Sequence, residues 1–503
     1  MLAILFFSPI LLFFVDFTGK LPVRLHGLEH IQFIPSILAG AYVIVAIWLA
    51  LTFVFGRVYC SVICPAGILQ DVINRIFCIG KKKKKGIRRF RYRLPSNVLR
   101  YVLAAVTFGT AVFGVTELCL LLDPYSNFGR IAANLFRPVV MEGNNLLADG
   151  LGKAGNYSLY HITITSVTAA SLIAAGSALV VFTLLVIFRG RLFCNTLCPV
   201  GALLSVVSRY SIFRIVFDKK ACIQCRSCEY VCKAEAIDPK KMKVDMSRCV
   251  DCFNCLSSCR KGALKYKPVP TVKKTAAAPV AATPPDSRRT FLATGVAVAA
   301  SLPLALLKGQ EARRKDAPFS LPVTPPGSLN LTRFKDKCTA CHLCVTKCPS
   351  HVLRPAGMEY GFDYFLKPRM AYIDSYCNYE CVICSEVCPT LAIRPLTVED
   401  KKTTQTGIAR FFIDRCIVHT EETDCGACSE HCPTQAVHMI PYKGTLTIPK
   451  VEDELCVGCG GCESICPVRP VRAILIEANE VHRLAEKPGE EEALDVNVDE
   501  FGF

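Results

Sequence analysis

The chain has 503 residues, of which 51% are hydrophobic and 20% charged. This composition excludes a disordered chain and a purely soluble domain, and it favours a membrane protein with polar domains attached. The formal net charge is +17, but most of the thirty cysteines occur in runs spaced two, two and three residues apart, which is typical of iron–sulfur ligands. Because each thiolate-bound cubane would contribute about −2, the positive total does not indicate nucleic-acid binding.

Four apolar stretches predict an α-helical membrane domain with four transmembrane helices over residues 1–217. Each stretch has roughly the 20 residues that a helix needs to cross about 30 Å of hydrocarbon. The stretches are residues 2–17, 36–55, 98–122 and 162–188. Lysines at 81–85 follow the second stretch, and Arg189 and Arg191 follow the fourth, so both loops are expected on the cytoplasmic side.

A two-cysteine motif occurs twice within this predicted domain. Cys60-x3-Cys64-Pro recurs as Cys194-x3-Cys198-Pro, and a Gly-Arg pair precedes each copy. A spacing of four places both thiols of one copy on the same helical face. Together the four thiols could hold one more metal centre. An iron–sulfur cluster, a dithiol redox pair and transient copper binding are all compatible with the pattern.

Residues 218–267 carry the strongest motif, two runs of Cys-x2-Cys-x2-Cys-x3-Cys. In such runs three thiolates hold one cube, and the fourth cysteine reaches the other cube. A bacterial-ferredoxin-like α+β domain with two [4Fe–4S] clusters is therefore predicted. The expected ligands are Cys222, Cys225, Cys228 and Cys259 for one cluster, and Cys249, Cys252, Cys255 and Cys232 for the other.

Residues 268–308 combine a Pro/Ala-rich linker with an export pattern. Ser287-Arg288-Arg289-Thr290-Phe291-Leu292 is similar to a twin-arginine signal, and an apolar segment at 291–307 follows it. This segment would extend about 25 Å as a helix, the lower limit for a span. A fifth, signal-anchor helix and export of the residues after it are therefore expected.

Four further cysteine runs lie in residues 309–503, and they predict a second ferredoxin domain with four clusters. The first and fourth runs keep the ferredoxin spacing, whereas the second and third have wider first gaps. Successive runs could pair, or the first run could share cysteines with the fourth. The runs are Cys338, Cys341, Cys344, Cys348; Cys377, Cys381, Cys384, Cys388; Cys416, Cys425, Cys428, Cys432; and Cys456, Cys459, Cys462, Cys466.

On these motifs, residues 1–267 resemble the NapH-type polyferredoxin family, and residues 287–503 resemble the NapG-type periplasmic ferredoxins. The resemblance implies a fused quinol dehydrogenase that feeds electrons from menaquinol or ubiquinol to a periplasmic reductase or cytochrome, as a component of a larger respiratory complex. The implied location is the bacterial cytoplasmic membrane, with residues 218–267 in the cytoplasm and residues 309–503 in the periplasm. The expected cofactors are six [4Fe–4S] clusters, and the Cys-x3-Cys-Pro pair could hold a seventh metal centre.

Quinol oxidation needs an apolar slot and a proton acceptor. The expected quinol and proton site is formed by Glu117, His26 and His30. Glu117 ranks first, because a carboxyl inside a span is costly and tends to be functional. Further candidates near the predicted outer face are Asp16, Glu29, Asp123 and His161.

Two other function classes fit the same motifs. A redox sensor or metal-reducing assembly factor would use its clusters without turning over quinol. A quinone-reducing protein fed by a cytoplasmic donor would run the same electron path in reverse. If residues 309–503 are exported, the two ferredoxin domains lie on opposite sides of about 30 Å of hydrocarbon, so the electron path needs an intermediate step. The alternative is a fifth helix that only packs, with every cluster on the inner side.

Overall fold

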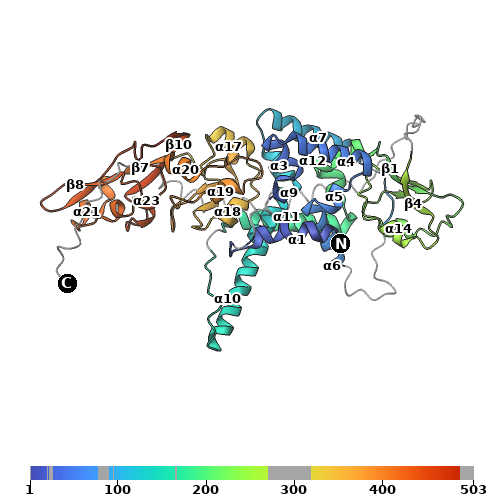
Figure 1. Ribbon diagram of the computed structural model, residues 1–503, viewed down its shortest axis with the longest axis horizontal. Helices are drawn as coiled ribbons and strands as arrows, with labels where there is room; N and C mark the ends of the chain where they lie inside the picture. The colour runs from blue at the N-terminus through green and yellow to red at the C-terminus, as the bar shows by residue number, and fades with distance from the viewer. Residues whose placement is uncertain are drawn as a thin grey trace, which may run out of the picture.

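The computed structural model describes residues 2–19, 21, 27–77, 90–94, 96–164, 167–269 and 319–487. Three parts lie in a row along its longest axis, with a helical part between two cysteine-rich parts (Figure 1). One core of buried side chains runs through all three parts, and it includes Phe14, Leu264 and Ile476. The predicted site residue His26, the lysines at 81–85 and the predicted export signal lie outside the described residues.

The helical part consists mostly of short helices, whose ends are set by proline, glycine and capping side chains. Pro65, Pro124 and Pro199 each stand in the first turn of a helix, where the missing N–H loses no hydrogen bond. Asp123 caps α9 by accepting bonds from the N–H groups of Tyr125 and Ser126. The helices are α1 (Leu2–Val15), α2 (Gly27–His30), α3 (Phe33–Ala39), α4 (Tyr42–Phe55), α5 (Tyr59–Val62), α6 (Pro65–Ile76), α7 (Asn97–Val112), α8 (Glu117–Leu122), α9 (Pro124–Ile131), η2 (Ala132–Phe136), α10 (Arg137–Lys153), α11 (Ala169–Arg189), η3 (Phe193–Leu197) and α12 (Pro199–Ser208).

The predicted four-helix membrane domain is wrong. Among the described residues, α11 is the one helix that is long and apolar enough to cross a membrane. The stretch at 36–55 is divided at Gly40 and the stretch at 98–122 at Gly114, where the backbone takes left-handed angles with φ of 82° and 80°. Hydropathy averaged over a window does not register a glycine that ends a helix. The first stretch forms only the 14-residue α1.

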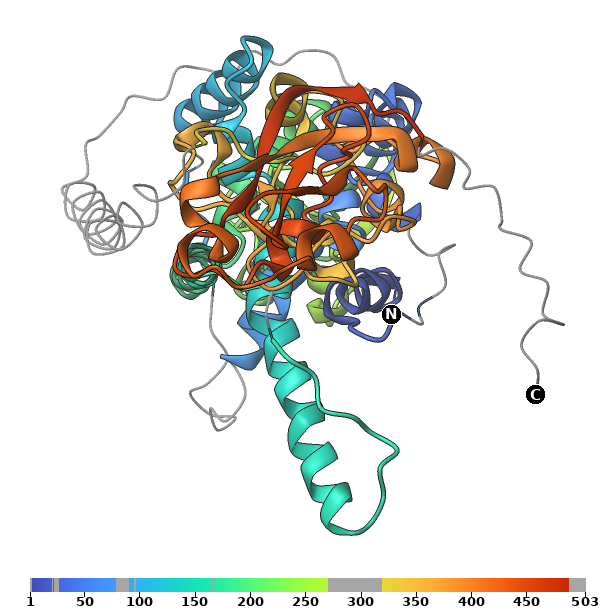
Figure 2. The same ribbon diagram turned by 90° about the vertical axis from the view of Figure 1, so that its left-hand side faces the viewer.

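Apolar side chains nevertheless cover much of the outside of the helical part. On α11, the exposed side chains include Val180, Leu184 and Phe188, and on α4 they include Val43 and Ile47. Helix α10 projects away from the body of the molecule (Figure 2).

The smaller cysteine-rich part follows α12 and has a ferredoxin-like arrangement of short strands and helices. Its outer strands pair antiparallel, with Phe213 opposite Pro268 and Phe217 opposite Leu264. The ligand loops run between these strands. The elements are β1 (Phe213–Phe217), α13 (Ser227–Tyr230), β2 (Ile237–Asp238), β3 (Lys243–Val244), α14 (Asn254–Ser258) and β4 (Leu264–Pro268).

The C-terminal part contains three antiparallel strand pairs, β5 with β6, β8 with β9, and β7 with β10. Short helices and cysteine-bearing loops connect them. The elements are α17 (Leu331–Lys337), α18 (Leu343–Lys347), β5 (Leu353–Pro355), η4 (Phe362–Tyr364), β6 (Pro368–Met370), α19 (Ile383–Glu386), α20 (Val398–Thr403), β7 (Thr404–Phe411), η5 (Ile413–Arg415), α21 (Ile417–Thr420), α22 (Ala427–Glu430), β8 (Val437–Pro441), β9 (Thr447–Val451), α23 (Gly461–Ile465) and β10 (Ile474–Leu484).

The C-terminal part docks on the helical part through a polar, largely buried interface. The Lys347 ammonium lies 2.7 Å from the Asp16 carboxylate, and both side chains are more than nine-tenths buried. Nearby, Asn134 Nδ2 lies 2.9 Å from His342 Nδ1. A charged group buried at an interface is destabilising unless it is paired, so these contacts hold the two parts in one relative position.

Candidate metal centres

The sixteen cysteines of the C-terminal part gather into four groups of four. In each group, three leading cysteines of one run meet the last cysteine of a neighbouring run. Burial raises the pKa of most of these thiols, and the thiols of the same group raise it further. The groups are Cys338, Cys341 and Cys344 with Cys388; Cys377, Cys381 and Cys384 with Cys348; Cys416, Cys425 and Cys428 with Cys466; and Cys456, Cys459 and Cys462 with Cys432. The first run therefore pairs with the second and the third with the fourth, a choice that the sequence left open.

The cysteines of the smaller part form two further groups. Burial raises the pKa of Cys228 to about 11, and the thiols of Cys259 and Cys225 act in the same direction. Cys222 begins the loop that carries Cys225. The second group lines a small cavity and consists of Cys232, Cys249, Cys252 and Cys255.

Backbone geometry in these loops suits anionic clusters. Residues between the cysteines take left-handed conformations, among them Gln224 and Asp251. The N–H of Ala236 donates to Cys232 Sγ at 3.4 Å, and the N–H of Ala263 donates to Cys259 Sγ at 3.3 Å. Such N–H groups stabilise the negative charge on cluster sulfurs.

The two Cys-x3-Cys-Pro copies meet inside the helical part. Cys60, Cys64, Cys194 and Cys198, here called the central group, are all buried. The pKa of Cys198 is raised by burial and then by the thiols of the other three members. Gln70 Nε2 donates to Cys194 Sγ at 3.2 Å, and the N–H of Gly201 donates to Cys198 Sγ at 3.3 Å.

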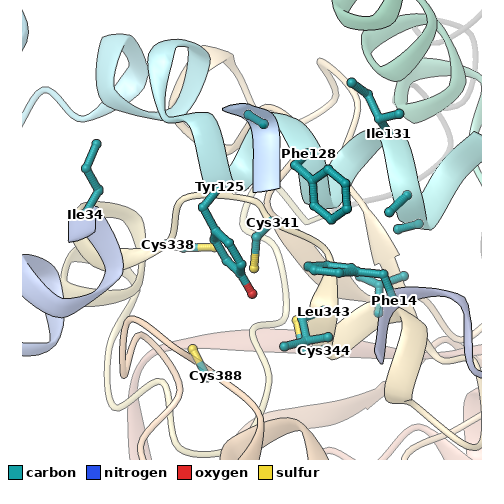
Figure 3. Packing of buried hydrophobic residues seen from close by; sticks show 14 of the residues in the cluster. Phe14, Ile34, Tyr125, Phe128, Ile131, Cys338, Cys341, Leu343, Cys344 and Cys388 are labelled. Atoms are coloured by element: carbon teal, nitrogen blue, oxygen red, sulfur yellow. The ribbon is translucent and has the colours of Figure 1, made fainter. Parts of the chain in front are cut away.

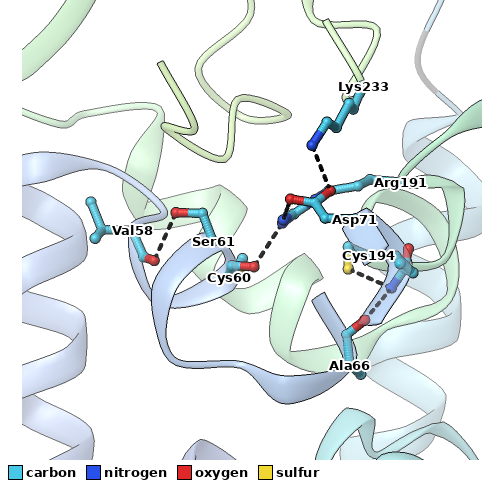
Figure 4. Close-up of polar contacts among 9 residues, drawn as sticks. Val58, Cys60, Ser61, Ala66, Asp71, Arg191, Cys194 and Lys233 are labelled. Carbon is cyan, nitrogen blue, oxygen red and sulfur yellow. Dashed lines mark hydrogen bonds and ion pairs between the residues drawn. The ribbon is translucent and has the colours of Figure 1, made fainter. Parts of the chain in front are cut away.

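An arginine from each copy crosses to the other copy. Arg57 donates to the Cys194 carbonyl at 3.2 Å and lies 3.7 Å from Cys60 Sγ. Arg191 donates to the Cys60 carbonyl at 2.7 Å and pairs with Asp71 at the same distance (Figure 4). Sequence reasoning missed both arginines as functional residues, although the Gly-Arg pair precedes both motifs.

The cysteines gather in fours, which is the number of thiolates that one [4Fe–4S] cubane needs. Among the residues that the structure describes, no group of three or more His, Cys, Asp or Glu side chains is close enough to hold one metal ion. Thiolates that bind different irons of one cube stand farther apart than thiolates that share a single ion.

The cysteine groups follow one another along the molecule. The N–H of Cys377 donates to the Cys459 carbonyl at 2.9 Å, which joins two C-terminal groups. Cys384 is close enough to help raise the pKa of Cys344, which belongs to the group nearest the helical part. At the other end, the charge of Cys252 acts on Arg191 of the central group.

Between the central group and the C-terminal groups lies a buried polar pair. The hydroxyl of Tyr125 donates to Glu29 Oε2 at 2.5 Å, whereas Glu29 Oε1 is buried without a hydrogen-bond partner. Burial raises the pKa of Glu29 to about 8. Figure 3 shows the Tyr125 ring beside Cys341. Toward the central group, the Tyr59 hydroxyl donates to Gln32 Oε1 at 3.0 Å, and Gln32 lies one helical turn after Glu29.

Two of the residues predicted for quinol, Glu117 and His30, lie in the described part of the chain. Glu117 begins α8 and is half-buried, and its charge acts on Lys367. His30 is half-buried and faces the Glu386 backbone, and burial lowers its pKa. No hydrogen bond joins Glu117 to His30 in the described parts of the chain. Of the further candidates, Glu29 and Asp123 both lie against Tyr125, which no sequence signal had marked.

Three family models match segments of the chain that carry these groups. A 4Fe–4S binding domain matches residues 38–86 and 169–220, which include the central group. Two 4Fe–4S dicluster domains match residues 245–352 and 423–469. The methylamine utilization ferredoxin-type protein MauM of Methylobacillus flagellatus is 32% identical over 166 residues, which are 31% of this chain and 68% of that protein. This chain belongs to the family of ferredoxin-type 4Fe–4S proteins.

Other relatives of this ferredoxin-type protein cover parts of it. The ferredoxin-type protein NapF of Escherichia coli is 25% identical over 158 residues, 31% of this chain and 87% of that protein. An uncharacterized protein of Methanocaldococcus jannaschii is 36% identical over 88 residues, and the chain spans 35% of its length. No solved structure matches significantly. Together, the cysteine groups and the matched domains identify an iron–sulfur electron-transfer protein.

Proposed function

We propose that this protein is a membrane-bound quinol dehydrogenase that passes electrons from menaquinol or ubiquinol through [4Fe–4S] clusters to a periplasmic reductase or carrier. One observation carries the proposal. A buried carboxyl, Glu29, is hydrogen-bonded to Tyr125 beside Cys341, at the point where the apolar helical part meets the row of cysteine groups. A quinol oxidant needs this combination of a proton acceptor and an electron acceptor side by side.

The proposal assigns one [4Fe–4S] cluster to each of the six cysteine groups in the two ferredoxin parts. A seventh is assigned to the central group, where the buried thiols, Gln70 and two arginines suit an anionic cluster. When bound, the clusters supply one-electron redox chemistry. With the central group included, the row reaches from one ferredoxin part to the other.

Each quinol releases two electrons and two protons. The carboxylate of Glu29 accepts a quinol hydroxyl proton, and Tyr125 holds the carboxyl in place from the other oxygen. Cys341, which lies beside Tyr125, would help to hold the cluster that takes up the two electrons one at a time. A pKa of about 8 brings the proton affinity of Glu29 near neutral pH, where general bases are most effective.

The membrane assignment rests on α11 and on the apolar outer faces of the helical part. Arg189 and Arg191 at the end of α11 support a cytoplasmic position for residues 218–267. The proposal places residues 309–503 in the periplasm of a bacterial cell, with the quinone pool of the membrane and a periplasmic reductase or cytochrome as the partners. The relatives' names support electron transfer but do not name a quinol.

Glu29→Gln tests the proposal, with Glu117→Gln as the matched control. Membranes are mixed with a short-chain quinol, and cluster bleaching is followed by absorbance. We expect Glu29→Gln to slow bleaching about 100-fold, the usual effect of losing a general base, and Glu117→Gln to change it less than about threefold. Dithionite should bleach all three proteins equally, which shows that the clusters are intact.

Two outcomes contradict the proposal. Failure of quinol to bleach any cluster would favour a redox sensor or metal-reducing assembly factor. If Glu29→Gln bleaches at the wild-type rate, Glu29 is not the proton acceptor.

A further inference from the structure

The smaller ferredoxin part has a surface of one charge sign. Every exposed charged residue between positions 218 and 269 is a cation, and the six acidic residues of this segment are buried or half-buried. The exposed cations, here called the basic face, are Lys219, Lys220, Arg226, Lys240, Lys241, Lys243, Arg260, Lys261, Lys265 and Lys267.

Two cations of the basic face lie next to the most accessible cysteine group. Cys225 is the one exposed cysteine among those that the structure describes. Arg226 follows it directly, and Arg260 is close enough to lower the pKa of its thiol, after hydrogen bonds from Ser227. Beside it, Ile223 is 64% exposed. An apolar centre with a charged rim is typical of protein interfaces.

The sign of this charge is informative. A [4Fe–4S] cluster with four thiolates carries about −2, so a bare cluster edge would repel an anionic protein. Cations around Cys225 reverse the local potential at the place where a partner must approach for electron transfer. This part, which contains β1 and β4, also lies at one end of the molecule, where a soluble protein can reach it (Figure 1).

We propose that the part of the basic face next to Cys225, which contains Lys220, Arg226 and Arg260, is the docking site of a small, acidic, soluble one-electron carrier of the ferredoxin or flavodoxin kind. The docked carrier is oxidised by one electron, and the cluster at Cys222, Cys225, Cys228 and Cys259 is reduced by one electron, with no bond made or broken. This goes beyond quinol oxidation, because it gives the row a second electron-exchange point. An anionic lipid surface is the competing occupant.

The test uses a reduced, acidic [2Fe–2S] ferredoxin, whose spectrum differs from that of [4Fe–4S] clusters. In stopped-flow mixing with the full-length protein, the second-order rate constant should fall steeply as salt is raised. At low salt, Lys220→Glu with Arg260→Glu should slow the reaction about tenfold or more. Lys240→Glu with Lys241→Glu, an equal charge change on the β2–β3 turn, should slow it less than about threefold.

Reduction by dithionite should be the same in all variants, which confirms that the clusters are present. A rate constant independent of salt, or equal in the two double variants, would overturn the proposal. The proposal would also be overturned if the Lys220→Glu, Arg260→Glu double variant bound vesicles of phosphatidylglycerol and phosphatidylcholine more weakly but reacted with the ferredoxin at the wild-type rate. Quinol-driven bleaching should be unchanged in these variants, so failure here is separable from failure of the proposed function.

Discussion

The central group and the loop-held groups reach the same chemistry by different routes. In the ferredoxin parts, three cysteines of each group come from one contiguous segment, and only the fourth comes from elsewhere. In the central group, two pairs from segments far apart in sequence meet at the starts of α6 and α12, and arginines cross between the copies. The loop-held groups therefore depend on local spacing, and the central group depends on how the helices pack.

The substitution with the largest expected effect on this difference is Gly201→Ala. A Cβ at Gly201 would lie 2.1 Å from the Cys194 carbonyl oxygen, a backbone atom that cannot move without moving the motif. We expect a loss of about 2–4 kcal/mol in stability, the usual scale for overpacking or strain, and loss of the central cluster alone. Thermal unfolding and iron content measure both effects.

Gly143→Ala in α10 is the matched control. A Cβ there meets nothing within 4 Å, so stability should stay the same or rise by up to about 1 kcal/mol. Equal iron content and equal melting in both variants would show that close packing does not hold the central group.

Sequence spacing predicts the cysteine runs well because a ligand loop is a local structure. It left the pairing of the C-terminal runs open, since Cys388 and Cys466 reach their groups only after the chain has folded. Spans were overpredicted, because Gly40 and Gly114 end helices inside apolar stretches. Glu29 could be named as one of several carboxyls, but its contact with Tyr125 depends on packing between segments.

The second test concerns how the stability of the protein depends on pH through Glu29, which is hydrogen-bonded to Tyr125 between the central group and the C-terminal groups. Burial raises the pKa of Glu29 from 4.5 to about 8, so the folded protein holds this proton more tightly than the unfolded chain. The resulting stability is fully present below pH 4.5 and is lost as pH rises through 8, by a few kcal/mol at most. Glu29→Gln should therefore flatten the fall in melting temperature across this range.

Glu117→Gln should keep the wild-type dependence on pH. A Glu29→Gln variant that loses stability with rising pH as the wild type does would show that Glu29 is not the buried acid responsible.

The smallest expected effect is a shift in the reduction potential of the central cluster, and it distinguishes the roles of Arg57 and Arg191. Arg57 hydrogen-bonds neutral oxygens and a thiol, whereas Arg191 is neutralised by Asp71. Arg57→Gln removes the less compensated cation, which should lower the reduction potential of the central cluster by about 60 mV, a tenfold change in a one-electron equilibrium. An EPR-monitored redox titration measures this shift.

The loop-held clusters provide the internal reference in that titration, because their potentials should not move. A uniform shift of every cluster, or none at the central cluster, would contradict the tuning role of Arg57.

Iron and acid-labile sulfide per chain test the central claim most directly. With four irons per cubane, the anaerobically prepared protein should hold about 28 irons, and Cys64→Ser with Cys198→Ser about 24. Cys119→Ser, at a buried cysteine outside the groups, should leave the count unchanged. Protein without labile sulfide, or a double variant with undiminished iron, would contradict a continuous row of clusters through the helical part.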